Sequence, residues 1–168
     1  VIVRSVFDRT LFVLGRAVAV AAPAGLIIWL AANISINGAN VLSVCAALLD
    51  PIGKIMGLDG VILLAFILGF PANETVIPII IMTYAASGTI GGAGNLSETL
   101  ALFLSNGWSV RTAVCFIIFT LMHWPCSTTL LTIKKETGSL KWTVLAFLLP
   151  TAAGVLLCIA ANLIFKLL

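Results

Sequence analysis

Long stretches of this chain carry no charged side chain, and this feature most limits what the chain can fold into. Uncharged apolar intervals of about 20 residues are typical of helices that cross a bilayer. Hydrophobic residues make up 61% of the sequence and charged residues only 9%, whereas a soluble domain carries about 25% charged residues. The polar surface is too small to cover a water-facing globule. The sequence therefore predicts an integral membrane protein and excludes a soluble enzyme.

Four intervals are long and apolar enough to be candidate spans, and the predicted fold is all-α. They run over about residues 11–33, 60–86, 110–133 and 140–165. We expect one or two of these spans to be broken at prolines, with short interfacial helices between them. Residues 41–49 are apolar but too few to cross a bilayer, and we expect Asp50-Pro51 to end an interfacial helix there.

Two segments between the second and third spans read as a turn and a short helix. The glycine-rich stretch 88–94 predicts a flexible turn, and it lacks the lysine of a phosphate-binding loop. Residues 96–104 predict a helix, which Asn106-Gly107 ends.

Lysine and arginine do not orient this arrangement in the membrane. The positive-inside rule compares the basic residues on the two sides. With four simple spans, one side carries Arg4, Arg9, Arg16, Arg111 and Lys166, and the other carries Lys54, Lys134, Lys135 and Lys141. The two sides are nearly even. An interrupted segment that enters and leaves on the same side would change this count.

The first polar interruption lies inside the second interval, at residues 69–74, Gly-Phe-Pro-Ala-Asn-Glu, with a further proline at Pro78. Pro71 cannot donate a hydrogen bond to the carbonyl of Ile67, and Pro78 cannot donate to that of Glu74. The residue before Pro71 is also biased away from helical geometry. We therefore expect Gly69, Pro71 and Pro78 to open the helix.

A helix broken at membrane depth can bind an ion, because freed carbonyls there must line a cavity or be buried in protein. Glu74 adds a carboxylate and Asn73 an amide oxygen to the same stretch. Two alternatives stay open for Glu74, which could pair with a basic residue of a neighbouring helix or cap a helix N-terminus.

The second polar interruption is His-Trp-Pro-Cys-Ser-Thr-Thr at residues 123–129, again with a proline inside a span. Imidazole and thiolate together suit a transition metal better than sodium or calcium, which makes His123 and Cys126 candidate ligands beside the helix-opening Pro125. In the alternative reading Cys126 only packs, and the hydroxyls that follow it bond back to helix carbonyls.

Other functions find little support in the sequence. Its one histidine and six carboxylates form no catalytic motif, so we expect a transporter rather than an enzyme. Nine basic residues are scattered, so we expect no nucleic acid partner. Cys45, Cys115 and Cys158 sit in apolar surroundings, which predicts packing and no disulfide framework. The chain begins at Val1 without the pattern of a signal peptide.

The two interruptions and their flanks resemble one family, ferrous iron transport protein B (FeoB). Residues 69–74 with Pro78 are similar to the signature of its second gate region. Residues 123–130 and the Lys-Lys-Glu-Thr-Gly-Ser of residues 134–139 are similar to its C-terminal signature, and Asp8-Arg9-Thr10 fits as well. The resemblance covers nearly all of residues 1–168, as the C-terminal gate-type part of such a transporter.

The resemblance implies part of a ferrous iron (Fe2+) uptake transporter in the bacterial cytoplasmic (inner) membrane, crossing it several times. It implies Glu74, Asn73 and Cys126 as contacts of the transported ion, with His123 as a weaker candidate. The family's GTP-binding domain and earlier gate region are absent from this chain, so we expect no GTP site here. The expected partners are the lipid bilayer and those missing regions, with self-association left open.

One alternative comes from another class of protein. Gate-type sequences also resemble spore-maturation membrane proteins, so the broken helices could serve docking in a non-transporting assembly protein. A third reading, nucleoside recognition, is weaker because few aromatic residues lie near the polar breaks in the sequence, Trp124 excepted.

Overall fold

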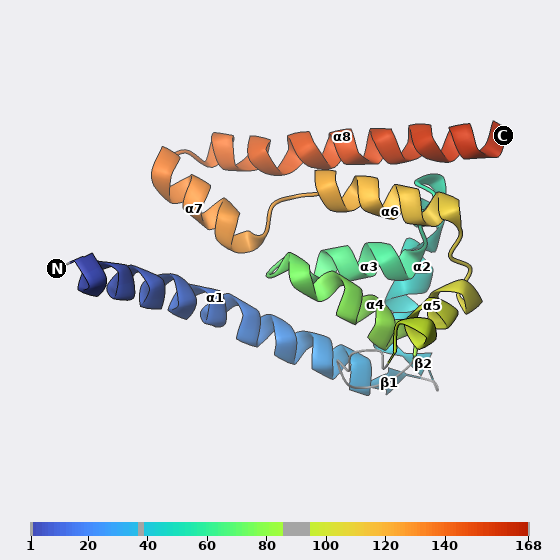
Figure 1. Cartoon of the computed structure of the whole chain (residues 1–168), viewed down its shortest axis with the longest axis horizontal. Coiled ribbons are helices and arrows are strands. Elements are labelled where there is room, and N and C mark those ends of the chain that lie inside the picture. The colour runs from blue at the N-terminus through green and yellow to red at the C-terminus, as the bar shows by residue number, and fades with distance from the viewer. Residues whose placement is uncertain (1, 37–38, 86–94, 168) are drawn as a thin grey trace.

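The computed structural model describes residues 2–36, 39–85 and 95–167 and is almost entirely helical (Figure 1). Its helices are α1 (Ile2–Asn33), α2 (Val41–Ile55), α3 (Gly60–Leu68), the 3-10 helix η1 (Asn73–Thr75), α4 (Val76–Tyr84), α5 (Leu96–Ser105), α6 (Val110–Met122), α7 (Ser127–Thr137) and α8 (Leu140–Leu167). A two-residue antiparallel pairing joins β1 (Ser35–Ile36) to β2 (Ala39–Asn40). The predicted helical fold is confirmed, and the predicted turn at 88–94 lies outside the described residues.

Two segments are long and apolar enough to cross a membrane by length and composition. They are Val110–Thr137, which holds α6 and α7, and Leu140–Leu167, which is α8; each has 28 residues. The helices α2 and α3 would make a third span only if the two are counted as one span despite the 109° bend between them. The membrane character of the chain is thus supported, while the predicted number of four spans is not confirmed.

α2 does not end at Asp50-Pro51, so that prediction was wrong. The helix continues through Pro51 to Ile55. Lys54 forms an ion pair with Asp50 one turn earlier, and the carboxylate of Asp50 also accepts a hydrogen bond from the backbone of Gly60. These contacts, with packing on α3, hold the last turn of α2 despite the donor that Pro51 lacks.

The interval 60–86 is not one broken span. α3 and α4 have nine residues each, about 14 Å at 1.5 Å per residue, which is half the thickness of a hydrocarbon core. The hydroxyl of Tyr84, at the end of α4, donates a hydrogen bond to Asp59, directly before α3. The chain therefore returns to where it started, and Figure 1 shows the two helices as a hairpin with the break at its tip. We call α3, η1 and α4 the re-entrant hairpin.

The re-entrant hairpin forms the centre of the molecule. Ile62, Ala65 and Phe66 of α3 and Ile79 and Ile80 of α4 are almost fully buried. Such burial is required of a helix pair whose tip ends at membrane depth, because its free backbone groups must be kept away from lipid.

α8 shows the opposite pattern and packs along α6 with one face only. Its large apolar side chains are widely exposed, among them Leu140, Leu148, Leu149, Leu156, Leu163 and Ile164. A surface of this kind fits contact with lipid tails.

Candidate functional site

The first break is a tight turn at the tip of the re-entrant hairpin. The amide of Gly69 donates a 2.7 Å hydrogen bond to the carbonyl of Ala65, and the amide of Ala72 donates a 2.9 Å hydrogen bond to the carbonyl of Gly69. A Cβ on Gly69 would lie 2.6 Å from Cγ2 of Val76 and 2.9 Å from the Ala65 carbonyl, so a side chain at residue 69 does not fit.

Two details of the first break differ from the prediction. The Ile67 carbonyl is not free, because it accepts a hydrogen bond from the amide of Phe70 at 3.3 Å. Pro78 lies in the first turn of α4, where an amide has no helical partner in any case, so this proline does not open the helix. The break itself is confirmed, and it falls at Gly69, Pro71 and the residues up to Thr75.

Asn73 and Glu74 both lie in η1 but in different surroundings. The side chain of Glu74 is exposed. Asn73 is half-buried, and its Oδ1 is a buried acceptor without a hydrogen-bond partner among the described residues. A buried, unpaired amide oxygen is costly, which makes Asn73 Oδ1 a candidate contact for a cation.

The second break separates α6 from α7, as Pro125 predicted. α6 ends at Met122, His123 is extended with ψ of 174°, and α7 begins only at Ser127. His123 and Cys126 therefore do not share one face of a continuous helix.

The hydrogen bonds of His123 determine which ring nitrogen is available. Its Nδ1 lies 2.8 Å from the carbonyl of Thr120 and 3.1 Å from that of Phe119. Carbonyls only accept, so Nδ1 carries the hydrogen and Nε2 keeps its lone pair. Nε2 is buried and has no partner among the described residues. Histidines that bind metals commonly donate their other N–H to a backbone carbonyl in this way.

Cys126 is surrounded by hydroxyls. Its Sγ lies 3.1 Å from Oγ1 of Thr128 and 3.1 Å from Oγ1 of Thr129. The sequence suggested that these hydroxyls bond back to helix carbonyls; the two threonines instead contact the thiol, while Ser127 Oγ is buried without a partner among the described residues. A threonine hydroxyl that donates to the sulfur would stabilise negative charge on it.

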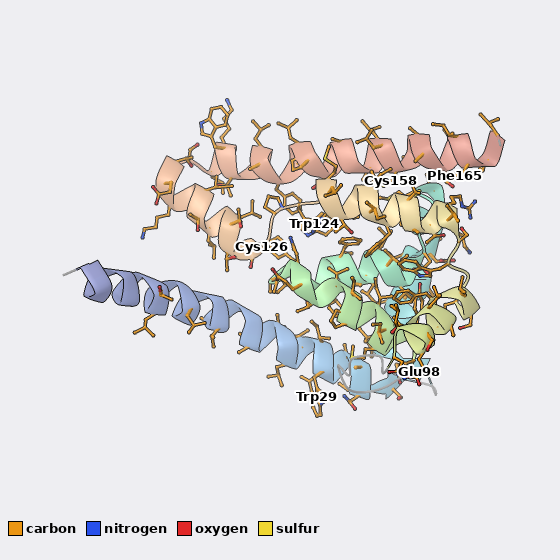
Figure 2. All side chains as sticks on the ribbon, viewed as in Figure 1. Trp29, Glu98, Trp124, Cys126, Cys158 and Phe165 are labelled. Atoms are coloured by element: carbon orange, nitrogen blue, oxygen red, sulfur yellow. The ribbon has the colours of Figure 1, made fainter. Side chains whose placement is uncertain are left out.

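The two breaks meet. The amide of Ser127, the first residue of α7, donates a 2.9 Å hydrogen bond to the carbonyl of Phe70 at the hairpin tip. Figure 2 shows Cys126 at the start of α7, beside the turn between α3 and α4. We call this place the break junction: residues 69–75 of the hairpin tip and residues 123–129 of the second break. Nothing in the sequence indicated this contact, because its partners lie 57 positions apart along the chain.

The break junction brings donor and acceptor groups together without forming a closed metal cage. Over residues 2–36, 39–85 and 95–167, no three His, Cys, Asp or Glu side chains are grouped so that they could hold a metal ion.

Aromatic rings around the junction were missed by the sequence reasoning. His123 packs on Phe66 with ring centres 4.9 Å apart, and Trp124 stacks on Phe147 of α8 at 5.6 Å. Ile67, Phe70, Trp124 and Phe147 line an apolar groove of about 270 Å³. Few aromatics lie near the breaks in the sequence, but α3, α6 and α8 bring distant rings together there.

Comparison with known proteins adds a family and several relatives. The sequence pattern of the Gate family, described as nucleoside recognition, matches residues 14–140. The Fe(2+) transporter FeoB of Staphylococcus aureus (strain MSSA476) is 30% identical over 141 residues, 79% of this chain and 20% of that protein. The Fe(2+) transporter FeoB of Methanocaldococcus jannaschii is 31% identical over 128 residues, 74% of this chain and 18% of that protein.

The chain thus spans about a fifth of the length of the curated relatives it matches. No solved structure matches it. The resemblance to the ferrous iron transporter family is confirmed by these relatives.

Proposed function

We propose that this chain, which belongs to the Gate family described as nucleoside recognition, forms part of the path of Fe2+ through a membrane transporter. The support is its similarity to proteins named Fe(2+) transporters. In this proposal the protein crosses the cytoplasmic membrane several times and is not itself an enzyme. It also includes cooperation with a GTP-binding domain and a further gate region outside this chain.

One observation carries the proposal: the hydrogen bond from Ser127 to the Phe70 carbonyl, which holds the two broken helices against each other. Asn73 Oδ1, His123 Nε2 and Ser127 Oγ lie in these two breaks, buried and without partners among the described residues. An ion that gives up part of its water shell would find replacement ligands there.

The groups of the junction have separate roles in this mechanism. Glu74 is exposed and attracts the cation to the hairpin tip by its charge. Asn73 supplies an oxygen ligand, and His123 supplies Nε2. Cys126 supplies a thiolate with two threonine hydroxyls beside it. Nitrogen and sulfur ligands favour Fe2+ over Mg2+, which prefers oxygen alone.

The test is anaerobic Fe2+ binding and Fe2+ uptake into liposomes by the purified chain, with Mg2+ as competitor. We expect His123→Gln and Cys126→Ser each to weaken Fe2+ binding by about tenfold or more, since loss of even an indirect support of a metal ligand costs 10- to 100-fold. Cys45→Ser is the matched control, because that half-buried thiol lies on α2 and outside the junction.

Unchanged Fe2+ binding in both junction variants would contradict the assignment of the ion path to the break junction. An unmodified chain that binds no Fe2+ would favour the alternative of a non-transporting assembly protein.

A second candidate function has its own observation. The groove of Ile67, Phe70, Trp124 and Phe147 is apolar and has a stacked aromatic pair, and the buried Nε1 of Trp124 has no acceptor among the described residues. A flat base could stack there and accept that hydrogen bond, in keeping with the family's description. Adding uridine and adenosine to the same binding experiment tests this: displacement of Fe2+ or direct nucleoside binding would favour it.

A further inference from the structure

A second polar region lies at the other end of α3 from the break junction. There α2 and α8 end and α6 begins, and a cavity of about 480 Å³ opens between them. Three basic side chains line it, Lys54, Arg111 and Lys166, each from a different helix, together with Asp50 and Asp59. We call it the basic cavity.

The two carboxylates of the basic cavity are already engaged. Asp50 pairs with Lys54 and accepts the amide of Gly60 at 3.2 Å. Asp59 accepts the amide of Ile62 at 2.7 Å through one oxygen and the hydroxyl of Tyr84 through the other. These contacts hold both carboxylates in place, and with three basic side chains against two acidic ones the lining keeps a net positive charge.

Arg111 and Lys166 are the two cations left over. Neither makes a hydrogen bond or an ion pair with any residue that the structure describes. Arg111 also lies in the first turn of α6, where the partial positive charge of the helix N-terminus adds to its own. The basic cavity therefore has the charge and the free N–H donors to bind an anion.

The surroundings of the cavity indicate where that anion comes from. Arg111 follows Val110, which is 74% exposed, and Lys166 precedes Leu167, which is 88% exposed. Two basic residues of the cavity thus stand next to exposed apolar side chains at the ends of two membrane-length segments. A free phosphate ion would use only the cations, whereas a lipid would use both surfaces.

We propose that the basic cavity binds the phosphate of an anionic phospholipid, with Arg111 and Lys166 as its ligands and the acyl chains along the exposed faces of α6 and α8. The proposal does not depend on iron transport, since no residue of the break junction takes part. A lipid held here ties together the ends of α2, α6 and α8.

The test uses native mass spectrometry of the 168-residue chain in detergent, titrated with phosphatidylglycerol and with phosphatidylcholine. The double variant R111Q/K166Q should bind phosphatidylglycerol roughly 25-fold more weakly, because each basic residue near an anionic lipid contributes about fivefold. Lys166→Gln alone, at an exposed position, should weaken binding by about fivefold and guards against misfolding of the double variant. Phosphatidylcholine binding should not change.

The control K134Q/K141Q removes two exposed cations from the ends of α7 and α8 that lie away from the cavity. An equal loss of phosphatidylglycerol in this control would overturn the proposal in favour of general surface attraction. Unchanged affinity in R111Q/K166Q would also overturn it. Binding of inorganic phosphate without any binding of phosphatidylglycerol would overturn it as well, because the cavity would then take the free ion rather than the phospholipid.

Discussion

At Gly60 the backbone of α3 lies close against the backbone of α2. A Cβ on it would lie 1.9 Å from the carbonyl oxygen of Ala46 and 2.7 Å from the amide of Asp50. Both of these atoms belong to the backbone, so neither can move aside as a flexible side chain would. Gly60 is the first residue of α3, directly after the 109° bend between α2 and α3.

Gly60→Ala should therefore destabilise the fold by about 1–3 kcal/mol, the usual range for an overpacked core. Gly25→Ala is the matched control, since no described part of the chain lies within 4 Å of the position where its Cβ would be. Replacing a helical glycine in this way stabilises by about 0.4–1 kcal/mol. Thermal unfolding in detergent measures both. Equal melting temperatures for the two variants would contradict the close approach.

At the scale of elements, the re-entrant hairpin is closed by a chain of hydrogen bonds. Asp59 caps the start of α3 by accepting from Ile62, and Tyr84 at the end of α4 donates to the same carboxylate. Trp108, which follows α5, donates through Nε1 to the Tyr84 hydroxyl at 2.9 Å. Three segments are thus joined at the open end of the hairpin.

Tyr84→Phe should loosen this end, because the Trp108 N–H and one Asp59 oxygen lose their partner. These groups are half-buried, so we expect a loss of about 1 kcal/mol, the low end of the cost of leaving a polar group unpaired, and faster hydrogen exchange in α3 and α4. In Thr120→Val the lost hydroxyl is exposed and bonds only within its own helix, so that variant should change little. If Tyr84→Phe left the hydrogen-exchange protection of α3 and α4 unchanged, these hydrogen bonds would not be what closes the hairpin.

At the scale of the whole molecule, the hairpin changes the order in which the chain crosses the membrane. Four simple spans would place Lys54 on the side opposite to Arg111 and Lys166. In the structure all three line one cavity, because the hairpin brings the chain back to the end at which it entered. Lys134 and Lys141 flank the turn at Gly138, at the far end of the long α8.

Labelling with a membrane-impermeant maleimide tests this arrangement. Lys54→Cys and Lys166→Cys should react from the same side, and Lys134→Cys from the other. The background carries Cys45→Ser and Cys126→Ser, while Cys115 and Cys158, both 0% exposed, are kept. Reaction of residues 54 and 166 from opposite sides would restore the model of four simple spans.

Several features of this protein follow from its sequence alone. The scarcity of charge predicts membrane helices, since burial in lipid depends on composition. Pro71 and Pro125 predict the two breaks, because a proline lacks the backbone N–H that a continuous helix needs. The same local rule failed at two other prolines. Pro51 lies inside α2, which packs on α3. Pro78 lies in the first turn of α4, where no helical donor is needed.

Only the tertiary structure decided how these pieces meet. The return of α4 to Asp59, the hydrogen bond between Ser127 and Phe70, and the meeting of Lys54 with Lys166 all join residues far apart in the chain. Local propensity acts over a few residues, whereas such contacts depend on which surfaces pack when the whole apolar core forms. The sequence thus determined that the helices break, and packing determined that the two breaks share one site.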